Sequence, residues 1–190
     1  MYVLALDIST SCTGWCVVDI DNCLGSSKVD LGYIPMSNIK GSYAKAQKVL
    51  ETFHEIKKIY EIDHIFVEEN LQSFRTGLSS AKTLATLSRF NGIVSYLSQS
   101  VFNVEPVFLN VNNARRSVGL KIIRKSKGGA DTKLQVLEWV KSQINHDWPK
   151  KTLKSGPRKG LTIIDPVCYD MADAYVIARS GIMNILPDMQ

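Results

Sequence analysis

Carboxylate side chains occur at three separated places in the sequence where hydrophobic packing would not select them. Asp7 ends the first apolar run of the chain, and Glu68 and Glu69 end another. Asp170 and Asp173 lie three residues apart in an apolar segment near the C-terminus, a spacing that places both on one face of a helix. Because a buried charge is costly unless a cation, a metal ion or solvent compensates it, these acids require an explanation.

The chemistry that such acids could perform is metal-dependent hydrolysis of a phosphodiester. Clustered carboxylates repel one another unless a cation lies among them. Mg²⁺ and Mn²⁺ prefer oxygen ligands, and two such ions about 4 Å apart can hold the attacking and leaving oxygens of a phosphodiester. We therefore expect two ions in a site made of Asp7, Glu68, Asp170 and Asp173. This chemistry needs no histidine, and we interpret His54, His64 and His146 as ordinary surface or strand-edge residues.

Each acid also has an ordinary structural interpretation. Asp7 could cap the turn that follows it, the two glutamates could form a solvated strand end, and the two later aspartates could face solvent. The joint pattern favours a shared site. Because adjacent side chains of a strand point to opposite faces, only one of Glu68 and Glu69 should reach that site directly.

The elements that would position these acids follow from hydrophobic periodicity. The expected strands are residues 2–7, 14–20, a third ending near residue 34, 64–70 and 104–109. The expected helices are residues 42–60, 79–102, a short one within 110–119, 131–144 and 165–181. Residues 145–160 are expected to be a basic loop, Asp131 a helix cap, Pro166 the first residue of the last helix and Gly181 its stop. This order predicts an α/β fold of the ribonuclease-H-like type, with a five-stranded mixed sheet whose first three strands are antiparallel and whose faces carry helices.

Composition indicates one domain over residues 1–190, since 45% hydrophobic residues suffice for one core. The sequence contains no apolar run of membrane-spanning length and no signal-peptide pattern, so no membrane partner is expected. Its four cysteines lack paired spacing, which favours reduced, packed thiols over a zinc site. Reduced thiols in turn indicate a cytoplasmic location.

Charge is distributed unevenly along the chain. Residues 115–159 hold 13 basic and three acidic residues, a net of +10, whereas the rest of the chain carries a net of −5. A solvated surface without a partner would be the simplest interpretation. The asymmetry favours a polyanion-binding face, with nucleic acid as the expected partner.

Four motifs in order carry a resemblance to a known family. They are "LALDISTSCTGWCVV" around Asp7, Thr13 and Gly14, "IFVEEN" around Glu68, "GGADTKLQVLEWV" around Lys133, and "DMADAYVIA" with Asp170 and Asp173. In this order they resemble the RuvC family of Holliday-junction resolvases, over residues 1 to about 181. The resemblance implies a homodimeric crossover-junction endonuclease that cuts two strands of four-way DNA junctions with Mg²⁺ or Mn²⁺, using these four acids.

The resemblance also implies DNA contacts. Lys133 would contact DNA near the site, Phe74 would stack on bases at the junction centre beside Arg75, and the 79–102 helix is a candidate dimer helix. Further phosphate contacts are expected from Arg115, Arg116, Lys121, Arg124, Lys125, Lys127 and the 150–159 run.

The sequence departs from the family pattern at three places. Ile8 and Ser9 replace the usual Pro-Gly, Glu69 replaces the usual Gln, and the loop before the last helix is longer and more basic. The departures concern junction selectivity and leave the nuclease interpretation intact. A divergent phage-encoded or organellar member fits as well as a bacterial one.

Three other function classes remain open. A ribonuclease H or a broader branched-DNA endonuclease would use the same acids. A non-catalytic nucleic-acid binder would not need them. An ATP-binding protein of the actin and sugar-kinase type, or a TsaB-like relative, would share the first strand and turn. A full ATP site in that fold needs a second glycine-rich phosphate turn, which the sequence lacks.

Overall fold

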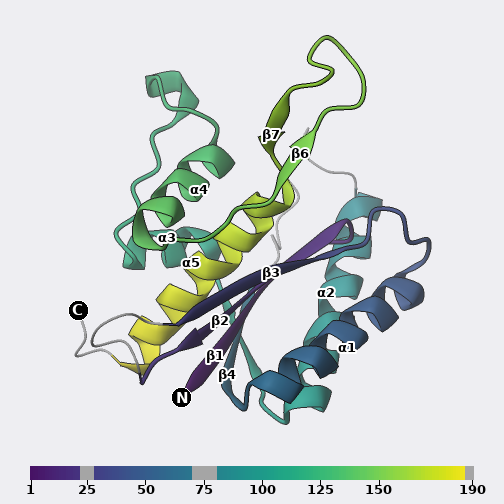
Figure 1. Cartoon of the computed structure of the whole chain (residues 1–190). Coiled ribbons are helices and arrows are strands. Elements are labelled where there is room, and N and C mark those ends of the chain that lie inside the picture. The colour runs from purple at the N-terminus through teal and green to yellow at the C-terminus, as the bar shows by residue number, and fades with distance from the viewer. Residues whose placement is uncertain (22–27, 70–80, 187–190) are drawn as a thin grey trace.

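The computed structural model describes residues 1–21, 28–69 and 81–186, and its centre is a five-stranded mixed sheet of order β3-β2-β1-β4-β5 (Figure 1). The strands are β1 Tyr2–Ile8, β2 Cys12–Asp19, β3 Val29–Pro35, β4 Ile62–Glu68 and β5 Pro106–Leu109. β1, β2 and β3 pair antiparallel, whereas β4 lies parallel to both β1 and β5. The expected fold class is confirmed.

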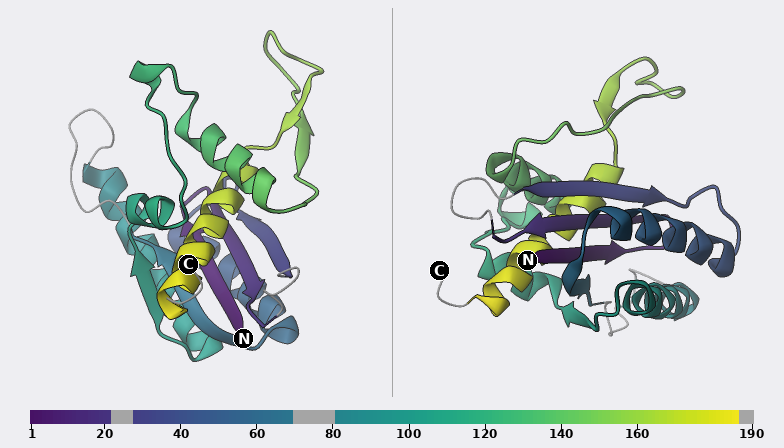
Figure 2. Two further views of the ribbon diagram at one scale, coloured as in Figure 1. Left: turned by 90° about the vertical axis from the view of Figure 1, so that its left-hand side faces the viewer. Right: turned by 60° about the horizontal axis from the view of Figure 1, so that its bottom comes forward.

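Helices cover both faces of this sheet, as Figure 2 shows from two further sides. The helices are α1 Ser42–Ile59, α2 Ala81–Phe102, α3 Val111–Ser117, α4 Thr132–Gln143 and α5 Val167–Ile185, with a 3₁₀ turn at Lys125–Lys127. The first two helices pack on one face, and α3, α4 and α5 pack on the other. No helix in the described ranges is both long enough and apolar enough to cross a bilayer.

Strand alternation assigns the side chains of β1 to two separate cores. Val3 and Ala5 pack toward α5, whereas Leu4 and Leu6 pack toward α1 and α2. The period of two therefore places Asp7 on the α5 face. On β4, Phe66 belongs to the α5-side core, so Glu68 falls on that face too.

Two predictions about the C-terminal third were wrong. Part of the expected 145–160 loop forms a hairpin of β6 Lys150–Thr152 and β7 Thr162–Ile164, whose short polar strands lack the alternation that identifies a strand. Gly181 does not stop the last helix, which continues to Ile185. A Cβ at Gly181 would lie 2.2 Å from the Phe66 ring, so glycine is needed there for close packing of α5 on β4.

The expected helix starts were closer to the structure. The Asp131 side chain accepts a hydrogen bond from the Lys133 backbone N–H at 3.0 Å and caps α4, as predicted. Pro166 immediately precedes the first residue of α5 instead of occupying it. The thiols of Cys12, Cys16 and Cys168 are free and buried, in accord with packed cysteines, and Cys23 lies outside the described residues.

Candidate active site

The carboxylates of three distant segments converge at the carboxyl ends of β1 and β4. Asp7 and Glu68 end neighbouring parallel strands on the same face, and α5 crosses that face with Asp170 and Asp173. The four acids are also close enough for their charges to affect one another. The pKa of Asp7 is raised well above its usual value, first by burial and then by the charges of the other three acids.

Close approach of α5 to the sheet depends on Gly14. This residue is the β2 partner of Asp7 in the antiparallel ladder. A Cβ at Gly14 would lie 2.1 Å from the backbone carbonyl oxygen of Asp170, far inside contact distance. The missing side chain therefore lets the helix lie against the sheet where the acids meet. Thr13, the preceding residue of the same motif, is fully buried beside Ile8, whose side chain belongs to the core on the opposite face.

Asp7 and Glu68 are neighbouring carboxyls whose charges repel each other. Burial, followed by the charge of Asp173, raises the pKa of Glu68 to about 7. A raised pKa in two adjacent carboxyls is the expected signature of like charges held together in a poorly solvated place. The backbone below Glu68 is also held, since buried Asn91 of α2 donates from Nδ2 to the Glu68 carbonyl oxygen at 3.4 Å.

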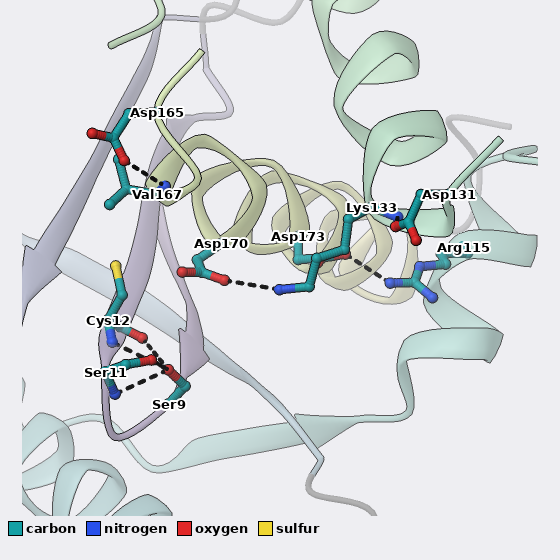
Figure 3. A network of polar contacts seen from close by, with 10 residues as sticks. All are labelled: Ser9, Ser11, Cys12, Arg115, Asp131, Lys133, Asp165, Val167, Asp170 and Asp173. Atoms are coloured by element: carbon teal, nitrogen blue, oxygen red, sulfur yellow. Dashed lines mark hydrogen bonds and ion pairs between the residues drawn. The ribbon is translucent and has the colours of Figure 1, made fainter. Parts of the chain in front are cut away.

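Two cations hold the acids of α5 (Figure 3). Lys133 Nζ lies 3.3 Å from Asp170 Oδ1, and Arg115 Nη2 donates to Asp173 Oδ1 at 2.8 Å. Burial alone would lower the pKa of Lys133, but the charges of Asp170 and Asp7 outweigh it and raise that pKa. The pKa of Asp170 is raised by burial, against the opposing effect of Lys133.

The structure gives Arg115 a different setting from the one its sequence position suggested. Its side chain is only 15% exposed and is committed to the buried Asp173. Arg115 is therefore mostly enclosed and held by Asp173, although it also lines a cleft beside α3. Only the tertiary contact between α3 and α5 produces this arrangement.

Gln135 has a positioning role that sequence reasoning missed. Its amide accepts from the Ile123 backbone N–H at 2.9 Å and donates to the carbonyl oxygens of Ile123 and Ala130 at 2.9 and 2.8 Å. These three bonds tie the basic loop before α4 to the helix that carries Lys133. The available signal is the Gln-Val pair in the "DTKLQV" motif.

Cys12 is a second residue that the sequence did not single out. It lines the same cleft as Asp170, and burial followed by the Asp170 charge raises the pKa of its thiol. The turn before it is held by Ser9, whose Oγ donates to the Cys12 carbonyl oxygen at 2.7 Å and accepts from the Cys12 N–H at 3.2 Å (Figure 3). Cys12 thus lines the candidate site beside an acid of another element.

An open cleft of about 880 Å³ leads from the acids to solvent. Its lining comes from β1, the β1–β2 turn, the end of β3, α4, the base of the hairpin and α5. The lining residues are Asp7, Ser9, Ser11, Cys12, Tyr33, Pro35, Ser37, Lys133, Lys151, Asp165, Pro166, Val167, Tyr169 and Asp170. A polymer could therefore reach Asp7 and Asp170 while lying against Lys133.

The other expected DNA contacts lie at varied places. Arg116, Lys121 and Arg124 line a second, basic cleft of about 530 Å³ together with Arg115. Lys125 is exposed and pairs with Asp131 at 2.9 Å, and Lys127 is exposed on the 3₁₀ turn. Phe74 and Arg75 lie outside the described residues.

The donor set fits a hard divalent cation, because all four acids offer carboxylate oxygens and Asp7 and Glu68 repel each other. The described ranges nevertheless contain no group of three or more His, Cys, Asp or Glu side chains already arranged around a metal position. Two of the four acids bond to Lys133 and Arg115 in this structure.

Comparison with known proteins identifies the fold. No protein-family model and no curated protein sequence matches the chain. Among solved structures, RuvC of T. thermophilus in complex with Holliday junction substrate matches with a TM-score of 0.62 at 14% identity, covering 97% of this chain and 95% of that one. A second T. thermophilus RuvC structure gives 0.58 at 16% identity, covering 98% and 97%.

A eukaryotic structure agrees. The yeast mitochondrial Holliday junction resolvase Ydc2 matches with a TM-score of 0.53 at 13% identity, over 98% of this chain and 82% of that one. The sequence motifs, the sheet order and these likenesses over nearly the whole chain lead to one conclusion: the chain has a RuvC-like Holliday junction resolvase fold.

Proposed function

We propose that this protein is a metal-dependent endonuclease that resolves four-way DNA junctions. The observation that carries the proposal is the convergence of Asp7, Glu68, Asp170 and Asp173 from three segments on one face of a RuvC-like sheet. Two of these acids, Asp7 and Asp170, line an open cleft that also contains Lys133. This combination suits a negatively charged polymer that must be held close to acids.

The four acids would hold Mg²⁺ or Mn²⁺, as one or two ions. When bound, such an ion lowers the pKa of water to make hydroxide and offsets charge on the phosphate and the leaving oxygen. The chain's own contribution is to keep four carboxylates together despite their repulsion. The position of Asp7 on β1, between β2 and β4, and the absence of a side chain at Gly14 keep them in place.

Lys133 would bind the backbone phosphate next to the cut. Its Nζ lies at the boundary between Asp170 and the cleft, and 55% of its side chain is exposed, so it can exchange a carboxylate for a phosphate partner. Arg115 is suited to a different task because it is mostly enclosed. It would orient Asp173 and offset its charge.

A homodimer would supply two such sites for paired cuts. Phe90 and Val94 of α2 are fully buried against α1 and cannot form the contact between subunits. The outward side of α2 exposes 68% of Tyr96, and on the same face of the sheet neighbouring β5 exposes Phe108, which pairs with Val67 of the α1–α2 core. We therefore assign the dimer contact to this side; a monomer at micromolar concentration in light scattering would contradict it.

Substrate competition tests the function. Wild-type protein with Mg²⁺ should cut a labelled four-way junction in preference to a flap, a linear duplex and an RNA–DNA hybrid, and EDTA should stop the reaction. Preference for the hybrid would favour a ribonuclease H, and equal cutting of junctions and flaps a broader branched-DNA endonuclease. No cutting of any of these substrates would refute the nuclease proposal.

A further inference from the structure

A basic hairpin stands apart from the rest of the molecule. We call residues 150–164, which are β6, β7 and their connection, the basic arm. The arm projects from the body of the protein in every view (Figure 1, Figure 2). Its base adjoins the candidate active site, because Lys151 and Asp165 line the same cleft as Asp7 and Asp170.

The arm has a defined shape although it lacks a core of its own. β6 and β7 pair antiparallel, with Lys151 opposite Ile163. The ladder continues beyond them, since the Leu153 N–H donates to the Leu161 carbonyl oxygen at 3.0 Å and the Gly160 N–H donates back to Leu153 at 2.9 Å. Gly156 and Gly160 have positive φ values of 79° and 88°, so the tip is a turn built on glycines. The charged tip is thus held in one place relative to the base.

Burial shows that the arm adds little to the fold. Most of its residues are exposed; Leu153, Ile163 and Ile164 are half-buried, and Ile164 packs on the α5-side core. Attachment depends on the base, where the Asp165 N–H donates to the Pro149 carbonyl oxygen at 2.9 Å and Lys151 lies 3.7 Å from Asp165. Because most of the arm extends into water, it contributes little to stability, and a contact with a partner explains it better.

All charged side chains of the arm are basic. Residues 150–164 contain Lys150, Lys151, Lys154, Arg158 and Lys159 and no acid. Among the described residues, only Lys151 of these five is within ion-pair distance of a carboxylate, the one at Asp165. The tip therefore carries three unneutralised positive charges on a backbone held by hydrogen bonds.

We propose that the basic arm contacts the phosphate backbone of one duplex arm of the DNA substrate, beyond the nucleotides in the cleft. This deepens, and rests on, the proposed function by assigning the DNA outside the cut to a named element. Strands rise about 3.3 Å per residue, so the tip reaches roughly 15–20 Å beyond Lys151, equal to about five base pairs at 3.4 Å each. Lysines and arginines that contact phosphates confer affinity and salt dependence without sequence preference.

The test compares two triple variants of equal charge in an Asp7→Asn background, which should bind DNA without cutting it. The arm variant is Lys154→Gln, Arg158→Gln, Lys159→Gln. The control is Lys48→Gln, Lys58→Gln, Lys141→Gln, which removes three basic side chains from α1 and α4, outside the arm, each paired with a neighbouring glutamate. Junction binding is measured by fluorescence anisotropy from 50 to 300 mM salt, with hydroxyl-radical footprints of each complex.

The arm variant should lose about 2.7 from the slope of log affinity against log salt, 0.9 for each lost phosphate contact, and bind at least about tenfold more weakly at 0.15 M salt. Footprint protection should disappear about five base pairs from the cut on one duplex arm and persist around the cut. The control should keep the slope and the footprint, and both variants should keep the wild-type melting temperature.

Equal slopes and footprints in the two variants would overturn the arm proposal, and so would a parent protein that binds no DNA. Wild-type cutting distinguishes this failure from failure of the proposed function. If wild-type protein cuts junctions while the arm variant binds like the control, the arm proposal alone fails. If wild-type protein cuts nothing while the arm variant loses slope and protection, the arm contacts DNA and the nuclease proposal fails.

Discussion

The two faces of the central sheet are built from the same strands but do different work. The face under α1 and α2 is apolar along β1, where Leu4, Leu6 and Ile8 are all buried. The α5 face begins in the same way with Val3 and Ala5 and then changes to a carboxylate at Asp7. One strand thus supplies a core on one side and part of a candidate site on the other, since its side chains alternate.

The comparison shows how an unfavourable cluster is kept. Desolvated like charges destabilise a folded protein, and their pKa values here are raised for that reason. The opposite face contributes continuous apolar burial directly beneath, including Phe53 and Phe90 at 0% exposure. Stability from that core offsets the cost of the acids, so substitutions on the two faces should have different consequences.

The largest difference is expected for activity. Asp7→Asn on the α5 face should reduce the rate of junction cutting by roughly 10³-fold or more. The reason is that when catalytic residues act as a unit, removing one of them abolishes most of the effect of the whole unit. Junction binding should stay or improve because one negative charge is removed. Glu55→Gln, on the exposed side of α1, is the matched control and should cut at the wild-type rate. Comparable rates for the two variants would contradict the assigned site.

Glycine-to-alanine substitutions on the two faces should change the free energy of unfolding in opposite directions. Gly14→Ala inserts a Cβ 2.1 Å from the Asp170 carbonyl oxygen and should cost about 1–3 kcal/mol or more in the free energy of unfolding. Gly92→Ala in α2 meets no described atom within 4 Å and should stabilise the helix by up to about 1 kcal/mol. Urea denaturation of both proteins measures these changes. Equal effects would mean that α5 can move away from the sheet without cost.

Replacement of the cleft lysine should have an intermediate effect. Lys133→Gln removes a charge-assisted contact to phosphate, worth about 1.5–3 kcal/mol, and should slow cutting about 10- to 100-fold. Lys133→Arg should restore part of the rate because it keeps the charge. Lys48→Gln on α1 provides the comparison on the other face. Single-turnover rates at saturating protein would show whether the loss is in the chemical step, and an unchanged rate would assign Lys133 a purely structural role.

The smallest effect concerns pH and the metal-free protein. The folded pKa of Glu68 is about 7 against an ordinary 4.5, so the folded state binds more protons than the unfolded chain between these values. The free energy of unfolding in EDTA should therefore fall as pH rises from about 4.5 to 7. Asp7→Asn should flatten this dependence, and Mg²⁺ should stabilise wild-type protein more at pH 7.5 than at pH 5. Stability that rises over this range would mean that the acids are not in repulsive contact.

Much of the fold was predictable from local patterns. The order of strands and helices, the acid at each strand end and the Asp131 cap all depend on periodicity and capping, which act over a few residues. The hairpin was missed because its strands are three residues each and polar. Gly181 was misinterpreted because a glycine near a helix end predicts a stop, whereas its actual cause is a ring on another strand.

The sequence by itself determined which residues are acidic, which face each takes and the order of elements around them. Only the tertiary structure decided that α5 lies against Gly14, that Arg115 is enclosed with Asp173, and that Lys133 lies between Asp170 and the cleft. The physical reason is range. Side-chain alternation and helix periodicity are properties of neighbouring residues, whereas burial, charge pairing and close backbone approach depend on segments about 40 to 160 residues apart that meet when the chain folds.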